Sequence, residues 1–326
     1  MSKLVTIFGG SGFIGRYIAR RMAREGWRVR VAVRRPNEAL FVRPYGAVGQ
    51  VEPVFCNIRD DASVQAVLAG ADAVVNCVGI LAEAGRNRFD AVQSEGAGRI
   101  ARLAAAAGIG RMVHISAIGA DPDSASAYAR SKAAGEAAVL AHQPEAVILR
   151  PSIVFGQEDQ VFNRFAGMAR FSLIVPLVGA QTRFQPVYVD DVAAAAVKGV
   201  LGQADPGVYE LGGPEVGTFR DFIVQMLRVI RRRRLVVNIP FALAGLIAGG
   251  CDLVAKVSLG LIPAALTRDQ VRSLKTDNVV SGAALGFADL GIDPVSSEAI
   301  LDAYLWRFRV AGQYADQVAS GKNLKV

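Results

Sequence analysis

The sequence has little cysteine and little histidine. Of its 326 residues, three are cysteine (Cys56, Cys77 and Cys251) and two are histidine (His114 and His142). Three cysteines far apart in the chain do not form a disulfide framework, and their number favours a reducing compartment. Neither histidine has a cysteine or a second histidine at the spacing of zinc ligands, so we expect no metal site.

Long apolar runs are also missing. The uncharged stretch from Leu235 to Cys251 contains Asn238, Pro240 and several glycines. A bilayer-spanning helix needs roughly 20 predominantly apolar residues, so this stretch is too short and too broken to span. Strand-like residues begin almost at Met1, so we expect no signal peptide.

Acidic side chains are the minority among the charged residues. There are 29 of them against 37 basic ones, which gives a net charge of +8. A basic balance fits nucleic acid, acidic lipids or an anionic cofactor. The sequence contains no known nucleic-acid-binding module and no ribbon of basic and aromatic residues, so we expect no nucleic-acid partner.

A glycine-rich turn is the most informative feature that is present. The apolar run Leu4–Phe8 predicts a buried parallel strand, and a helix is expected from Phe13 to about Glu25. Between them the glycines follow the pattern G-x-x-G-x-x-G, a variant of the G-x-G-x-x-G fingerprint. Such a turn lets the backbone approach a pyrophosphate at the positive end of the helix. The predicted contact residues are Gly9, Gly12, Phe13, Ile14 and Gly15.

The first half of the chain alternates short apolar runs with helical patterns. This alternation predicts an α/β fold of the Rossmann type, a doubly wound parallel sheet over residues 1–155. Residues 156–326 are expected to form a smaller C-terminal α/β subdomain, interleaved with the last strands. The predicted strands are Leu4–Phe8, Val29–Val33, Pro53–Asn57, Ala73–Val78, Met112–Ser116 and Val147–Pro151, with further short ones at Val187–Val189 and Val208–Leu211; the clearest helices are Ser94–Ala107 and Ser131–Ala141.

Two arginines follow the second predicted strand. NAD sites usually place an acidic residue there for the ribose 2′-hydroxyl, whereas an arginine suits a 2′-phosphate. Arg34 and Arg35 therefore favour NADPH (or NADP⁺) over NAD(H). The other interpretation is a solvated basic loop.

Tyr128 and Lys132 lie four residues apart, on one face if the segment is helical. In a nicotinamide enzyme the Lys charge is expected to lower the pKa of the phenol, so that Tyr128 can exchange a proton beside the hydride. Ser116, at the end of the fifth predicted strand, lies just before them and strengthens this interpretation.

Together these segments resemble the extended, NAD(P)-dependent epimerase/dehydratase-like members of the short-chain dehydrogenase/reductase superfamily. The resemblance includes Gly9–Gly15, Asn57–Asp60, Asn76–Gly79, Tyr128 with Lys132, Leu149–Gly156 and Val187–Ala193. It implies that Ile58 flanks the adenine, that Val78 and Gly79 line the dinucleotide, that Lys132 contacts the ribose, and that Pro151 and Ile153 lie near the nicotinamide. Asn57 stands where most members carry Asp beside the adenine.

One departure from that pattern concerns catalysis. The catalytic hydroxyl of extended members usually lies one or two residues beyond the position of Ser116, and here those residues are Ala117 and Ile118. Without that donor, Tyr128 loses a partner that binds developing oxyanion charge. The pair Tyr128 and Lys132 is then vestigial.

Four segments look like one atypical branch of this superfamily, the nucleotide-binding accessory subunits of respiratory complex I (NADH:ubiquinone oxidoreductase). They are Gly9–Tyr17, Val113–Ala117, Ser126–Glu136 and Tyr209–Glu215. The resemblance implies a tightly held NADPH with a structural or regulatory role, and complex I subunits as partners. It also implies a peripheral location on the inner, energy-conserving membrane, on the cytoplasmic side in a bacterium or the matrix side in a mitochondrion.

The segment near residues 231–266 combines charge with apolar residues. Arg231–Arg234 precede the uncharged stretch, and such a cluster can bind an anionic membrane surface. A buried subdomain with a solvated arginine run is the alternative. The tail from Tyr304 is expected to be either a docking arm or a frayed terminus.

Three functions remain open from the sequence. The first is a non-catalytic, NADPH-binding subunit of complex I. The second is a soluble NADP-dependent reductase, epimerase or dehydratase that uses Tyr128 and Lys132. The third is a regulator that senses NADP(H) without turning it over.

Overall fold

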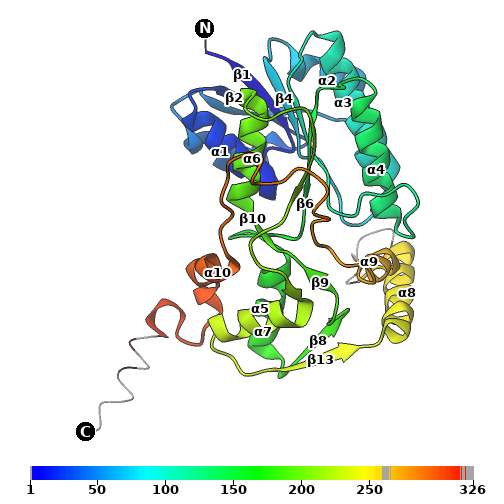
Figure 1. The fold of residues 1–326 in the computed structure, drawn as a ribbon, viewed down its shortest axis with the longest axis vertical. Helices are drawn as coiled ribbons and strands as arrows, with labels where there is room; N and C mark the ends of the chain where they lie inside the picture. Colours follow the sequence, from blue (N-terminus) through cyan, green and yellow to red (C-terminus); the bar gives the residue numbers. More distant parts are fainter. Residues whose placement is uncertain (1, 259–263, 265, 316, 318–319, 321–326) are drawn as a thin grey trace.

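The structure, a computed structural model, describes residues 2–258, 264, 266–315, 317 and 320. Its centre is a seven-stranded parallel sheet in the order β11-β6-β5-β4-β1-β2-β3 (Figure 1). The order reverses between β1 and β4, the switch point of a doubly wound sheet. The strands are β1 (Leu4–Phe8), β2 (Arg28–Val33), β3 (Val51–Phe55), β4 (Ala73–Asn76), β5 (Met112–Ile115), β6 (Val147–Pro151) and β11 (Gly207–Leu211). The predicted fold class is confirmed.

Helices cover both faces of the sheet. On one face α1 (Phe13–Arg24) and α6 (Val189–Leu201) share an apolar core with the sheet. On the other, α2 (Asp61–Leu68), α3 (Glu95–Ala106) and α4 (Ala127–Leu140) form a second core. The π-turn Asp90–Ser94 leads into α3, and a 3-10 segment, Pro36–Tyr45, follows β2.

Most strand predictions differ from the structure by one or two residues at an end. β1 and β6 have the predicted bounds, whereas β4 ends at Asn76 instead of Val78. The reason is local, because the Asn76 side chain accepts a hydrogen bond from the Val78 amide at 3.1 Å and turns the chain out of the sheet. β3 ends at Phe55, two residues before the predicted Asn57, whose amide donates to the Ser63 hydroxyl instead.

The second half of the chain forms smaller sheets and a third core beside the carboxyl ends of the main strands (Figure 1). Each small sheet has two strands. The elements are β7 (Val154–Phe155), α5 (Val161–Phe171), β8 (Ile174–Val178), β9 (Arg183–Phe184), β10 (Val187–Tyr188), β12 (Gly217–Thr218), α7 (Phe219–Val229), β13 (Leu235–Ile239), α8 (Phe241–Val257), α9 (Arg268–Ser273) and α10 (Ser297–Leu305), followed by 3-10 turns at Trp306–Phe308 and Gly312–Tyr314.

The uncharged stretch from Leu235 to Cys251 is divided between two elements. Its first residues form β13, which pairs with β8, and after Pro240 the remainder belongs to α8. In the part of the chain that the structure describes, no helix has both the length and the apolar character needed to cross a membrane.

The tail begins inside the core. Tyr304 is buried, and its hydroxyl donates to the buried Asp159 carboxylate at 2.5 Å. The tail is therefore packed where it starts, in contrast to a frayed terminus. The last residues of the tail, 321–326, lie outside the described residues.

Candidate dinucleotide site

The glycine turn connects β1 to α1 with open backbone amides. Gly9 has a φ of +73°, and its amide donates to the Ala32 carbonyl of β2 at 3.0 Å. A Cβ on Gly15 would lie 2.4 Å from the Gly9 carbonyl oxygen, so only glycine allows α1 to approach the turn this closely. Gly12 caps α1 without a side-chain hydrogen bond. Amides at the start of a helix that no side chain satisfies are the usual ligands of a phosphate.

The two arginines after β2 have different partners. One Arg34 guanidinium nitrogen donates to the neutral Asn87 side-chain oxygen at 3.1 Å, whereas Arg35 forms an ion pair with Glu38 at 3.0 Å. Both side chains are exposed. Because no carboxylate in the described part of the chain pairs with it, Arg34 is the better candidate for a 2′-phosphate. Asn87 has no sequence motif that points to it.

The residues after β4 lie against the glycine turn, and those after β3 lie against α3. Gly9 packs against the backbone of Cys77 and the side chain of Val78. Ile58 lies over Gly96 of α3, where a Cβ would come within 2.8 Å of its side chain. The Asn57 side-chain oxygen accepts from the Arg59 amide at 3.2 Å, so its carbonyl group is engaged within its own turn.

Lys132 is buried beneath the carboxyl ends of β4 and β5. Its ammonium group donates to the Ile115 carbonyl at 3.1 Å, and a Cβ on Gly79 would lie 3.5 Å from it. Burial lowers the pKa of Lys132 to about 8. The carboxylate of Glu136, one helical turn later, accepts two hydrogen bonds from Arg150, one from Nε at 2.9 Å and one from a terminal nitrogen at 2.6 Å.

Tyr128 lies one turn before Lys132 on α4, as predicted, but the expected pKa direction is wrong. Burial raises the pKa of the Tyr128 phenol to about 12. The ring packs edge-on against Phe89 with centroids 5.9 Å apart, and the Lys132 ammonium is directed at the Ile115 carbonyl. An apolar environment and a cation engaged elsewhere both leave the phenol in its neutral form.

Two buried polar atoms at the end of β5 have no hydrogen-bond partner among the described residues. They are the Ser116 hydroxyl and the Nε2 atom of His114, whose Nδ1 lies 3.1 Å from the Asn76 amide nitrogen. An unsatisfied buried polar group is costly, and a bound ligand or water is the usual remedy. The orphan Ser116 hydroxyl and the open amides of α1 therefore both fit a dinucleotide lying across the carboxyl ends of the strands.

A segment from the far end of the chain closes this edge. The Ser152 hydroxyl, between Pro151 and Ile153, donates to the Asn278 side-chain oxygen at 2.7 Å. The Asn278 side-chain nitrogen in turn contacts the Ile118 carbonyl at 3.3 Å. Asn278 thus bridges β6 and the turn after β5. It belongs to no recognisable motif, so the sequence could not have placed it.

Helix α9 supplies the cap of α4. The Asp269 carboxylate accepts from the Ser126 hydroxyl at 2.8 Å and from the amides of Ala127 and Tyr128 at 2.7 and 3.1 Å. A carboxylate at this position satisfies orphan donors and complements the helix dipole. A residue more than a hundred positions away thus fixes the start of the helix that carries Tyr128 and Lys132.

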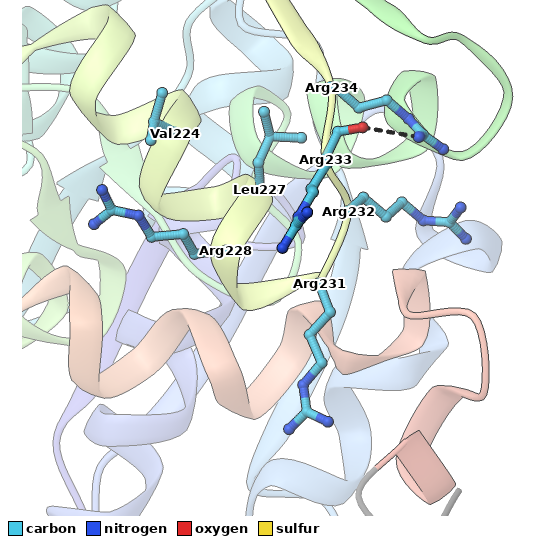
Figure 2. Close-up of a pocket in the computed structure, with 7 residues that line it drawn as sticks. All are labelled: Val224, Leu227, Arg228, Arg231, Arg232, Arg233 and Arg234. Carbon is cyan, nitrogen blue, oxygen red and sulfur yellow. Dashed lines mark hydrogen bonds between the residues drawn. The ribbon is translucent and has the colours of Figure 1, made fainter. Parts of the chain in front are cut away.

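The arginine run Arg231–Arg234 lines a hollow of about 540 Å³ with Val224, Leu227 and Arg228 of α7 (Figure 2). Two of its side chains have structural roles. Arg232 donates to the Phe308 carbonyl at 2.9 Å, and Arg234 donates to the Ala169 carbonyl at 2.8 Å. In Figure 2 the side chains of Arg232 and Arg234 extend to the same side of the run, whereas that of Arg231 extends away from them. The run therefore spreads positive charge over a surface and does not converge on one point.

Comparisons with known proteins agree with this geometry. Residues 5–212 match the model of the NAD dependent epimerase/dehydratase family. The chain is 36% identical over 98% of its length, and 81% of the relative's, to NADH dehydrogenase [ubiquinone] 1 alpha subcomplex subunit 9, mitochondrial, of Arabidopsis thaliana. It is 30% identical to the NADH-ubiquinone oxidoreductase 40 kDa subunit, mitochondrial, of Neurospora crassa, over 95% of this chain and 80% of that one.

A solved structure confirms the fold. The NADPH-dependent quinone oxidoreductase QOR2 of Escherichia coli, crystallised with NADPH, superposes with a TM-score of 0.69 at 17% identity, covering 92% of this chain and 98% of that one. At this identity the likeness concerns the fold alone.

Proposed function

We propose that this chain, which belongs to the NAD dependent epimerase/dehydratase family, is an accessory subunit of respiratory complex I and that its glycine turn holds NADPH. The observation that carries the proposal is the likeness to complex I subunits of Arabidopsis thaliana and Neurospora crassa along almost the whole chain. This likeness includes the C-terminal region, beyond the 5–212 match to the family model.

The proposed nucleotide contacts follow the edge of the sheet. The amides of the turn and of the first residues of α1, Phe13 and Ile14, bind the pyrophosphate, and Arg34 binds the 2′-phosphate. The remaining contacts are proposed for Arg35, Asn57, Ile58, Val78, Gly79, Ser116, Tyr128, Lys132, Pro151 and Ile153. When bound, NADPH supplies a hydride donor.

The chain's own residues are poorly arranged for turnover. The raised pKa of Tyr128 keeps its proton in place, and Ala117 and Ile118 offer no hydroxyl where a substrate carbonyl would need one. We therefore assign the nucleotide a structural or regulatory role. The buried Lys132 and the orphan Ser116 hydroxyl hold the ligand without reacting with it.

We propose that Arg231–Arg234 and the exposed apolar side chains beside them face the membrane. Phe171, Leu173 and Leu235 are 86%, 73% and 62% exposed, and they lie in or beside β8 and β13, next to the arginine run. Exposed apolar side chains beside basic ones suit an anionic bilayer surface or a partner subunit. This supports a peripheral place on the energy-conserving membrane, on the cytoplasmic side in a bacterium.

Copurification tests the proposal. Membranes from the native host are solubilised in mild detergent, and the chain is expected to migrate with NADH:ubiquinone oxidoreductase activity and to release NADPH on denaturation. If the chain migrates apart from that activity, the proposed subunit role is wrong.

A soluble NADP-dependent reductase remains the second candidate, favoured by one observation. Tyr128, Lys132 and the unpaired Ser116 hydroxyl all lie at the carboxyl end of β5 or on the helix that follows it. Purified chain that oxidises NADPH with a small carbonyl substrate, and loses this turnover in Tyr128→Phe, would establish that function.

A further inference from the structure

Helices α8 and α9 lie side by side below α4 (Figure 1), and the groove between them has two chemically different walls. Its volume is about 400 Å³, within the range of ligand sites in proteins. α8 contributes Phe241, Ala242, Gly245 and Leu246, and the α9 side contributes Arg268, Val271, Arg272 and Lys275.

The α9 wall carries unmatched positive charge. Arg268, Arg272 and Lys275 are exposed, and none of them forms an ion pair with an acidic side chain among the described residues. The Lys275 ammonium lies 5.8 Å from the centre of the Phe241 ring, across the groove. The Asp252 carboxylate of α8 accepts the backbone amide of Arg268 at 3.1 Å, and three side-chain cations outnumber this one carboxylate, which favours an anionic ligand.

A glycine of α8 lets the Arg268 guanidinium lie against that helix. A Cβ on Gly249 would come within 2.3 Å of an Arg268 terminal nitrogen. Gly249 lies one turn after Gly245, which lines the groove, so both glycines open the same face of α8. The guanidinium is therefore held close to the apolar wall.

The α8 wall continues into an exposed apolar helix face. Leu246 lines the groove and is 74% exposed. Further exposed apolar side chains lie along the same helix, namely Leu243, Ile247, Leu253, Val254 and Val257. Monomeric soluble proteins rarely present so many apolar side chains together without a partner.

We propose that the groove between α8 and α9 binds one anionic phospholipid. The phosphate is bound by Arg268, Arg272 and Lys275, because guanidinium groups donate paired, charge-assisted hydrogen bonds to phosphate oxygens. The acyl chains lie along the apolar face of α8, beginning at Leu246. The choice of a membrane lipid as the ligand rests on the proposed function, which places the protein at a membrane. The choice of this groove as the site rests on its cationic wall and its apolar wall.

A free phosphate would use only one wall. The lipid uses both, since its headgroup is anionic and its chains are apolar, and the two parts meet at the glycerol. The test therefore compares a lipid with its own headgroup. Monomeric dihexanoyl-phosphatidylglycerol is titrated into the purified full chain by calorimetry at constant ionic strength, beside glycerophosphoglycerol and dihexanoyl-phosphatidylcholine. We expect saturable binding of one phosphatidylglycerol per chain, and at least about tenfold weaker binding of both other probes.

Two kinds of variant locate the site. Arg268→Gln with Arg272→Gln should weaken phosphatidylglycerol binding about tenfold or more, whereas Arg24→Gln with Arg28→Gln, which removes the same charge from exposed positions in α1 and β2, should not. Gly245→Leu fills the groove without changing charge, and a Cβ there meets nothing within 4 Å, so the helix accepts it. It should abolish binding. Gly110→Leu, an equally open position in the loop before β5 and outside the groove, should leave binding unchanged.

The outcomes separate the alternatives. Binding of glycerophosphoglycerol as tight as that of the lipid would mean a free-anion site and overturn the proposal. Binding that survives Gly245→Leu, or that both arginine pairs weaken equally, would mean unspecific adsorption and overturn it too. Copurification with complex I by a chain that binds no lipid would reject only the groove, and lipid binding by a chain that does not copurify would reject only the subunit role.

Discussion

The Asp269 carboxylate lies 2.7 Å from the backbone nitrogen of Ala127, so α9 caps the helix that carries Tyr128 and Lys132. The same short helix forms the cationic wall of the α8–α9 groove. One element thus connects a surface of the C-terminal region with the dinucleotide site.

Asp269→Asn should loosen that connection. The loss of a charged cap is expected to lower the free energy of unfolding by about 1 kcal/mol and to weaken NADPH binding through the start of α4. Denaturant unfolding and a fluorescence titration with NADPH measure the two effects. Asp123→Asn is the control, since it removes the same charge from an exposed residue of the preceding loop. Equal effects of the two variants would show that the cap is unimportant.

Arg34→Asp should weaken NADPH binding more than NADH binding. It removes a charge-assisted contact with the 2′-phosphate, worth roughly 1.5–3 kcal/mol, which NADH does not make. Arg35→Asp serves as the comparison, because the Arg35 charge is already paired with Glu38. The measurement is the dissociation constant of NADPH and of NADH for the native chain and for each variant. Equal losses of the two nucleotides in Arg34→Asp would assign the 2′-phosphate to another residue.

Gly15→Ala should prevent nucleotide binding. The added methyl group would lie 2.4 Å from the Gly9 carbonyl oxygen and 2.7 Å from the Gly10 Cα, so the turn and α1 must move apart. We expect a loss of bound NADPH on purification and a destabilisation of about 1–3 kcal/mol. Gly110→Ala meets nothing within 4 Å and should change neither. Full NADPH occupancy in Gly15→Ala would contradict the proposed role of the turn.

His114 should make the protein sensitive to mild acid. Burial lowers the pKa of His114 to about 3, far below the ordinary value of about 6.5. As the pH falls below 6.5, the His114 imidazole binds a proton in the unfolded chain but stays neutral in the folded chain. The free energy of unfolding therefore falls by up to about 1.4 kcal/mol per pH unit. Urea unfolding between pH 6.5 and 5 should show this slope in the native chain, and not in His114→Gln. A matched change of the exposed His142 to Gln should leave the slope in place.

Local patterns predicted the sheet and the turn well, because both depend on neighbouring residues. The apolar run Leu4–Phe8 is fully buried as β1, and the spacing of Tyr128 and Lys132 places them on one helix. The predicted pKa direction of Tyr128 was wrong because burial of the phenol raises its pKa, and the neighbours that bury it, Phe89 among them, surround the ring only in the folded chain.

Contacts between residues far apart in the sequence could not be predicted. Asp269 and Asn278 reach the site from the far end of the chain, and neither belongs to a motif. The difference between Arg34 and Arg35 also needs the structure, since it depends on whether Asn87 or Glu38 lies within reach.

The pairing of β11 with β6 has a consequence for fragments of this protein. β11 spans Gly207–Leu211 and is the edge strand of the main sheet, so a chain cut near residue 155 would leave β6 with unpaired amides and carbonyls. Such an open edge recruits strands from other molecules. A nucleotide-binding fragment that ends before β11 should therefore aggregate on expression.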